Sequence, residues 1–174
     1  MDSEFVEPSG EIVDPSAISI SKAKELLVAL QDSNIEYCNL VECRSFESND
    51  VIVIDVEVEL GQKRVHDIRP AERIAVQFEK SDTRTPKAFA LRSDFPFVPH
   101  INITVEEFPR ELCLYASPYS ELKRQWTPSR FVERIRDWLA LTAKGKLHQN
   151  DQPLEPLLWG SEGNIVLPLS LIHI

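Results

Sequence analysis

The sequence predicts an α+β fold, in which a small antiparallel sheet lies between an N-terminal and a C-terminal helix. Two stretches, 18–32 and 128–145, repeat apolar residues with the spacing of an amphipathic α-helix. Between them, 35–91 holds short apolar segments separated by turns, with no helical pattern that could carry a parallel crossover. We therefore expect an N-terminal helix, an antiparallel four-stranded meander and one or more C-terminal helices.

Length and composition are those of a single globular domain with short appendages. The chain has 174 residues, of which 43% are hydrophobic and 27% charged, so it can bury one core. It has no apolar run of about eighteen residues, and its acidic first residues do not follow the order of a secretory signal. We expect a cytoplasmic protein with no membrane partner. A net charge of −9, spread along the chain, argues against nucleic acid as a partner.

Residues 1–17 have the composition of a flexible leader, with prolines and a glycine among acidic and small residues. In the helix that follows over 18–32, Ser19 or Ser21 is expected to act as the N-cap by accepting a free backbone N–H. The buried face of this helix is expected to carry Ala23, Leu26, Leu27 and Leu30.

The strands of the meander are expected at 35–46, 52–60, 73–78 and 89–91. A turn at 48–50 joins the first two strands. The clearest pattern is that of the second strand, where apolar residues alternate with Asp55, Glu57 and Glu59. We expect this strand to be half buried, with a row of carboxylates on its solvent-facing side.

Prolines mark the segment that leads to Cys113. Pro96 and Pro99 lack amide donors, so 95–103 is expected to be an edge strand or an extended crossing. The following segment, 106–111, is acidic and contains a proline, so we expect the regular strand to have ended before Cys113. The cysteine would then lie on an irregular connection after the sheet.

The C-terminal helix has clear signals at both ends. After a predicted loop at 117–120, Thr127 supplies a hydroxyl N-cap and Pro128 fits the first helical position. Gly145 is expected to end the helix. The apolar stripe comprises Phe131, Ile135, Trp138, Leu139 and Thr142. Residues 147–174 are expected to form a tail or a linker toward a following domain.

Cys113 is the candidate nucleophile among three cysteines. A thiolate is reactive even when only a small share of the thiol is ionised, and it can hold an acyl group as a thioester. His100 and His148 are the nearest histidines in sequence, and either could act as a general base or orient the thiol. Taken alone, a Leu-Cys-Leu segment is more typical of a buried structural thiol, and each histidine is more typical of a surface residue.

The other sequence features give no sign of a cofactor. Cys38 and Cys43 lie in the first predicted strand and are expected to be small core residues. The cysteines are odd in number and have no CxxC spacing, so neither a disulfide framework nor a zinc site is indicated. The chain also lacks a glycine-rich phosphate loop, so we expect no metal or nucleotide cofactor.

The order of the motifs resembles that of the ubiquitin-conjugating enzymes. Phe-Pro-Phe-Val-Pro-His stands at 95–100, Leu-Cys-Leu at 112–114 and Trp-Thr-Pro at 126–128. That family has a Tyr/Phe-Pro-Phe-x-Pro-Pro strand, an active-site Cys followed by Leu, and a Trp-(Ser/Thr)-Pro helix start in this order. The likeness covers 18–145. The family's His-Pro-Asn triplet is absent, and 106–111 stands in its place. In this respect the chain is similar to divergent bacterial members of the family from antiviral and ubiquitin-like conjugation operons. Those members are often fused to a ThiF-type activating domain.

The resemblance implies a UBC-like domain over 18–146, in which Cys113 carries a ubiquitin-like protein as a thioester. It further implies an activating enzyme, separate or fused in the native chain, as donor and an amine of a protein target as acceptor. The alternative is a catalytically inert module of the same fold that binds a ubiquitin-like protein or an activating enzyme, and a thiol hydrolase or protease is a third possibility. In the absence of the usual asparagine, the oxyanion donors could be backbone amides around Cys113 or the side chains of His100, Asn102 or His148.

Overall fold

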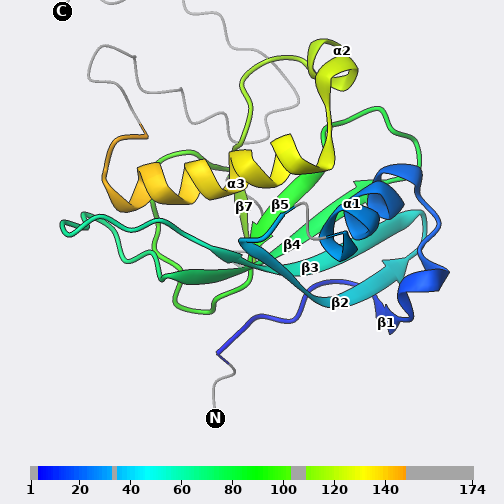
Figure 1. Ribbon diagram of the computed structural model, residues 1–174, viewed down its shortest axis with the longest axis horizontal. Helices are drawn as coiled ribbons and strands as arrows, with labels where there is room; N and C mark the ends of the chain where they lie inside the picture. Colours follow the sequence, from blue (N-terminus) through cyan, green and yellow to red (C-terminus); the bar gives the residue numbers. More distant parts are fainter. Residues whose placement is uncertain (1–3, 33–34, 103–108, 148–174) are drawn as a thin grey trace, which may run out of the picture.

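Two helices lie against one face of the sheet in the computed structural model (Figure 1), which describes residues 4–32, 35–102 and 109–147. The strands are β1 (Glu11–Val13), β2 (Cys38–Phe46), β3 (Asn49–Glu57), β4 (Ala71–Glu79), β5 (Lys87–Ala90), β6 (Ile101–Asn102) and β7 (Arg110–Leu112). The helices are α1 (Ser21–Gln31), α2 (Tyr119–Leu122) and α3 (Pro128–Ala143), with 3-10 turns at Pro15–Ala17 and Lys123–Gln125.

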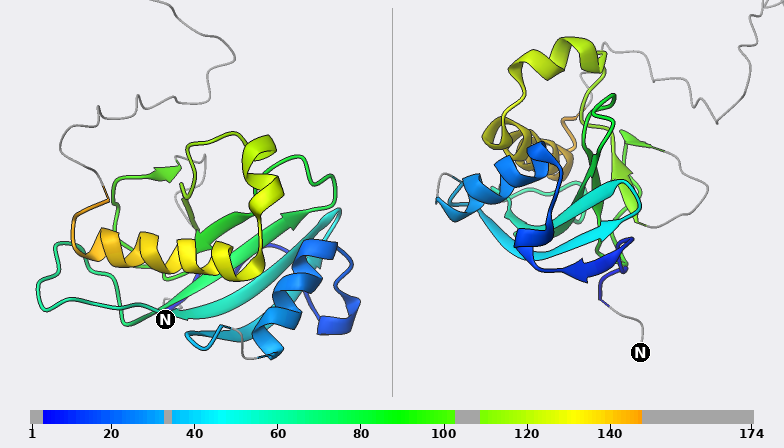
Figure 2. Two further views of the ribbon diagram at one scale, coloured as in Figure 1. Left: turned by 45° about the horizontal axis from the view of Figure 1, so that its top comes forward. Right: turned by 90° about the vertical axis from the view of Figure 1, so that its right-hand side faces the viewer.

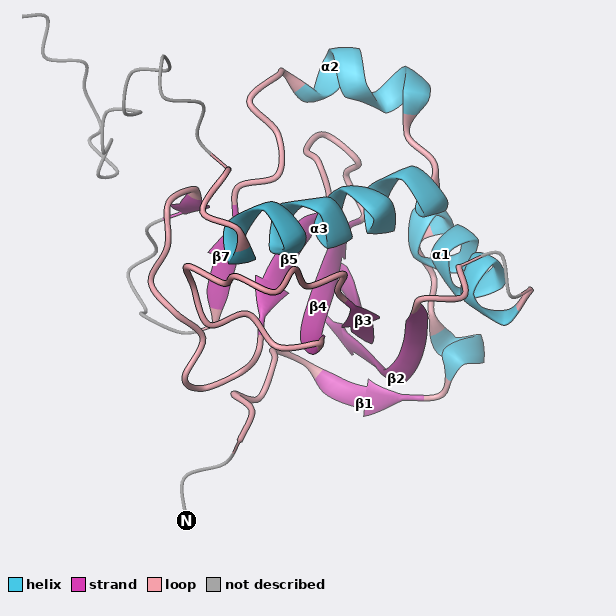
Figure 3. Cartoon of the chain, turned by 60° about the vertical axis from the view of Figure 1, so that its left-hand side comes forward, coloured by secondary structure: helices cyan, strands magenta, loops and turns pink. Residues whose placement is uncertain are grey.

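The strands form one antiparallel sheet in the order β1-β2-β3-β4-β5-β7-β6. Figure 3 shows the run from β1 to β5 and β7. The α+β class is confirmed, and β2 to β5 follow one another as a meander. The expected number of four strands is too small, because the described part of the chain contributes seven strands to this sheet. The additional strands β1, β6 and β7 have only two or three residues each, too few for a periodic pattern in the sequence.

The main core lies between the sheet and the helices α1 and α3 (Figure 2). The apolar stripe predicted for α3 is confirmed, since all five of its members are buried. Both predicted ends of α3 are confirmed as well. Thr127 Oγ1 accepts the Arg130 N–H at 3.3 Å, and Gly145, at a φ of +64°, donates its N–H to the Thr142 carbonyl at 2.9 Å.

The start of α1 is held by a residue from another element. The predicted caps Ser19 and Ser21 are wrong, because the N-cap position is Ile20 and no side chain caps it locally. Instead, the buried Asp50 carboxylate of β3 accepts the N–H groups of Ser19 and Ile20, each at 2.8 Å. Asp50 belongs to strand β3, so the predicted turn at 48–50 is wrong in position. The turn is formed by Glu47 and Ser48.

The opposite face of the sheet has a second, smaller apolar cluster. It consists of Val51, Val53, Ala75 and Leu91, packed by Phe5, Phe46 and Phe89. Strand β3 is therefore buried on both faces from Val51 to Ile54, where a half-buried strand was expected. The predicted row of carboxylates is confirmed, since Asp55 is partly exposed, and Glu57 and Glu59 are exposed. Asp55 also pairs with Arg73 in two contacts of 2.9 Å.

The N-terminal segment covers this second cluster. Sequence composition predicts a flexible leader over 1–17, whereas within that stretch β1 pairs with β2. The Val6 N–H donates to the Leu91 carbonyl at 2.7 Å. The buried Arg44 guanidinium donates to the carbonyls of Pro8 at 3.0 Å and Gly10 at 2.9 Å. Regular structure thus begins before the predicted boundary at residue 18.

A buried ion pair ties β4 to the chain that follows β5. Arg92 and Glu72 are each 1% exposed, and the guanidinium donates to both carboxylate oxygens at 3.1 and 3.0 Å. Arg92 also donates to the Asp67 carbonyl at 2.5 Å and to Asp94 Oδ1 at 2.8 Å. These contacts fix the point from which the chain enters the proline-containing segment that starts at Phe95.

Candidate active site

Strand β7 leads directly into Cys113. It lies between β5 and β6, with Glu111 opposite both Phe89 and Asn102. The sequence does not predict β7, because Arg110 and Glu111 resemble loop residues although both are buried within the sheet. The prediction that the regular strand has ended before Cys113 is confirmed, since β7 ends at Leu112. Cys113 itself follows the strand on an irregular connection, as predicted.

The backbone on both sides of Cys113 is fixed. Leu112 and Leu114 are 4% and 5% exposed and belong to the main core, whereas Cys113 between them is partly exposed. The Cys113 N–H donates to the His100 carbonyl at 2.9 Å. One residue later, the Leu114 carbonyl accepts Nε of Arg134 from α3 at 2.9 Å. This arrangement presents the thiol from a rigid support.

The other two cysteines are buried, as predicted. Cys38 is 6% exposed and Cys43 is 2% exposed. Burial raises the pKa of the Cys38 thiol to about 12, with a smaller contribution from Asp55. The pKa of Cys43 is also raised, mainly by burial. Both thiols therefore stay protonated at neutral pH, and Cys113 is the cysteine of this chain that is not buried.

Of the two candidate histidines, the structure brings His100 to Cys113 through its main chain. His100 adopts a φ of +62°, an uncommon conformation for a residue with a Cβ, and its carbonyl receives the Cys113 N–H. A role of the imidazole stays a prediction. His148 lies outside the described residues.

A polar cluster beside Cys113 could not be read from the sequence. Glu111 is 8% exposed, and its two carboxylate oxygens accept Lys87 Nζ at 3.0 Å and Asn102 Nδ2 at 2.7 Å. The three side chains come from β7, β5 and β6, so they share one face of the sheet. The sequence signal for this cluster was the spacing of two residues between Glu111 and Cys113. This spacing puts two side chains on the same side of the chain only if the segment is extended, which the sequence did not predict.

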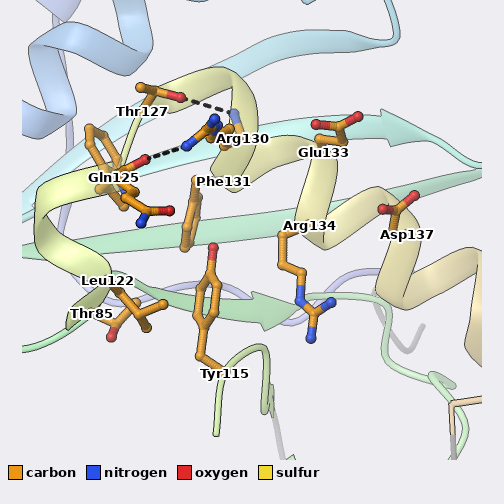
Figure 4. A pocket seen from close by; sticks show the side chains of 11 residues that line it. Thr85, Tyr115, Leu122, Gln125, Thr127, Arg130, Phe131, Glu133, Arg134 and Asp137 are labelled. Carbon is orange, nitrogen blue, oxygen red and sulfur yellow. Dashed lines mark hydrogen bonds between the residues drawn. The ribbon is translucent and has the colours of Figure 1, made fainter. Parts of the chain in front are cut away.

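On the α3 side, the connection after Cys113 borders a pocket of about 260 Å³ (Figure 4). Tyr115 rises toward Phe131, with ring centroids 6.4 Å apart and an interplanar angle of 26°. Arg134 lies beside it, its guanidinium carbon 5.8 Å from the Tyr115 ring centroid. Burial raises the pKa of Tyr115. The wall of the pocket formed by α3 alternates in charge through Arg130, Glu133, Arg134 and Asp137.

The same connection is anchored further along by α2. The predicted loop at 117–120 is wrong from Tyr119 onward, because Tyr119 begins this short helix. Asp82, in the turn after β4, accepts the Tyr119 hydroxyl at 2.6 Å and pairs with Lys22 of α1 at 2.5 Å and Lys123 at 2.7 Å. One carboxylate thus joins three elements, which explains why local sequence alone did not predict the helix.

Within 4–32, 35–102 and 109–147, no group of three or more His, Cys, Asp or Glu side chains is placed to hold a metal ion. None of the helices described is long and apolar enough to cross a membrane.

Comparisons with known proteins place the chain in a family. Neither the curated proteins nor the solved structures include a match. The family model described as prokaryotic E2 family A matches residues 36–172. This span is more than half of the chain and includes Cys113, β2 to β7 and α3. The chain therefore belongs to prokaryotic E2 family A, among the divergent bacterial members of the UBC-like group that its motifs resemble.

Proposed function

We propose that this chain carries a ubiquitin-like protein as a thioester on Cys113 and transfers it to an amine of a protein target. Membership of the E2 family implies a role in ubiquitin-like conjugation and transferase activity in general. The observation that carries the finer proposal is the contrast among the cysteines. Cys113 is partly exposed on a fixed backbone, whereas Cys38 and Cys43 are buried in the core.

The proposed reaction has two acyl transfers. In the first, the Cys113 thiolate attacks the carbonyl carbon of a thioester on the activating enzyme. The new C–S bond forms as the old one breaks, and the thiolate of the activating enzyme leaves. In the second, a neutral target amine attacks the same carbonyl, an amide forms, the amine loses a proton, and Cys113 is released as a thiolate.

Both steps pass through a tetrahedral oxyanion that needs a hydrogen-bond donor, and one donor is typically worth about 3 to 4 kcal/mol. The Cys113 N–H donates to the His100 carbonyl, so this amide is already engaged. Asn102 is the better candidate. Glu111 holds one N–H of its carboxamide at 2.7 Å, and the group carries a second N–H. Asn102 pairs with Glu111, which makes it a diagonal neighbour of Cys113, a position typically about 7 to 8 Å away.

A reconstitution experiment tests the thioester. The chain is incubated with ATP, an activating enzyme and a ubiquitin-like protein from its own organism, and the products are separated with and without reductant. The wild-type chain should form an adduct that thiol reductants cleave, and Cys43→Ala should form it too. Cys113→Ala should form none, and Cys113→Ser should form an ester that resists reductant and is cleaved by alkali.

The result also separates the proposal from its alternative. Adduct formation by Cys113→Ala would show that another residue is the acceptor. Binding of the ubiquitin-like protein or the activating enzyme without any adduct on the wild-type chain would instead identify an inert binding module of the same fold.

A further inference from the structure

The register of β5 and β7, continued beyond the residues that are paired, brings Lys87 opposite Cys113. On β5 and β7, Phe89 is opposite Glu111 in antiparallel pairing. Extending this register by two residues toward Cys113 brings it to Lys87. The pairing of β6 with β7 extends in the same way, since the Cys113 N–H still donates to the His100 carbonyl at 2.9 Å beyond the end of the strand. Cys113, one residue beyond the end of β7, thus still has a hydrogen bond to the neighbouring segment before β6.

Lys87 also lies on the face of the sheet to which Cys113 belongs. Its ammonium is 6.0 Å from the Phe89 ring centroid and 3.0 Å from the Glu111 carboxylate, so these side chains share one face. Leu112 points to the opposite face and is buried in the main core. Because side chains alternate along a strand, Cys113 returns to the face of Glu111.

We infer that Lys87, held in place by Glu111, stabilises the thiolate form of Cys113. The inference rests on the proposed function, because it assigns a positioning residue to the same site. An ammonium within about 4 to 6 Å of a thiol favours its ionised form. The Lys87 side chain is 42% exposed and that of Glu111 is 11% exposed, so the cation lies at the solvent edge and the carboxylate lies beneath it.

In the described residues, the charged groups near Cys113 include a cation that favours the thiolate and an anion that disfavours it. Lys87 comes from β5, Glu111 from β7 and His100 from the segment before β6, while Arg134 approaches from α3 through the Leu114 carbonyl. Without Lys87, the Glu111 carboxylate two residues away would disfavour the thiolate. Removing Glu111 would take away an anion and leave the cation. The two substitutions should therefore act in opposite directions.

The test is the pH dependence of Cys113 alkylation by iodoacetamide in the folded full chain, read by mass spectrometry of the peptide that contains it. Lys87→Gln should slow the reaction at pH 7 by about three- to tenfold, corresponding to a thiol pKa raised by half a unit to one unit. Lys87→Arg should restore the wild-type profile. Glu111→Gln should speed the reaction. Lys63→Gln removes an exposed lysine of the β3–β4 connection and serves as the charge-matched control.

Two results would overturn the inference. One is a wild-type rate for Lys87→Gln. The other is an equal slowing by Lys87→Gln and Glu111→Gln, which is expected if the pair only braces the sheet. The reconstitution assay tests the proposed function independently of this inference. If no adduct forms but the two substitutions change alkylation in opposite directions, the proposed function alone is refuted. If the adduct forms but Lys87→Gln leaves the alkylation rate unchanged, this inference alone is refuted.

Discussion

The buried pair of Arg92 and Glu72 gives the sharpest stability prediction. Replacing Arg92 with Met keeps most of the side-chain volume and leaves Glu72, which is 1% exposed, without its main cation. Breaking a buried pair from one side typically costs about 3 to 5 kcal/mol, because an uncompensated charge stays in the interior. For a domain of this size that corresponds to a melting temperature lower by about 6 to 20 °C.

The second half of this prediction is a partial recovery in a double variant. Glu72→Gln removes the charge and keeps an oxygen to accept the Arg69 N–H, which Glu72 Oε1 now accepts at 2.8 Å. Arg92→Met combined with Glu72→Gln should therefore be more stable than Arg92→Met alone, by about 1 to 3 kcal/mol. Urea unfolding at equilibrium, followed by circular dichroism, measures all four members of the cycle.

The pH dependence of the Arg92→Met penalty provides an internal check. Burial raises the pKa of Glu72, and the hydrogen bonds from Arg92 oppose this rise, so the substitution should raise it further. A carboxyl whose folded pKa lies above its unfolded value gives a folded state that binds more protons. Stability is then lost as the pH rises through that interval and regained as it falls. The penalty should be smaller at pH 5 than at pH 8. A penalty under about 1 kcal/mol, or one that grows toward low pH, would refute the argument.

Three further predictions concern the site and its supporting helix. Asn102→Ala should slow discharge of the Cys113 thioester to lysine by about 10²-fold in a single-turnover assay, whereas the exposed Asn39→Ala should leave the rate unchanged. Thr127→Ala removes the N-cap of α3 and should cost about 1 kcal/mol of unfolding free energy. Gly145→Ala should cost about 1 to 2 kcal/mol, because φ is +64° there. Unchanged urea midpoints for the last two variants would contradict the assigned caps.

Features that depend on neighbours in the chain could be predicted from the sequence. The ends of α3 follow from Thr127, Pro128 and Gly145, each of which acts within one turn of the helix. The central strands follow from the alternation of apolar residues, which needs no knowledge of partners. The position of Cys113 on an irregular connection follows from the acidic, proline-containing segment 106–111 before it.

The remaining features depend on partners far along the chain. The carboxylate that holds the start of α1 comes from Asp50, some thirty residues away, so no local cap signal was needed. Strand β7 exists because two neighbours pair with it, and its buried Glu111 resembles a loop residue in the sequence. The contact of Lys87 with Glu111, two residues before Cys113, follows from strand register, which cannot be derived from a single sequence.

The contacts of the N-terminal segment determine which residues the domain needs in order to fold cooperatively. A fragment that starts at residue 18 would lose the carbonyls of Pro8 and Gly10 that receive the buried Arg44 guanidinium. It would also expose to water the cluster on which Phe5 packs. Its unfolding transition should broaden and its surface should bind hydrophobic dyes. We therefore expect the cooperative folding unit to include residues before 18, although their composition is that of a flexible leader.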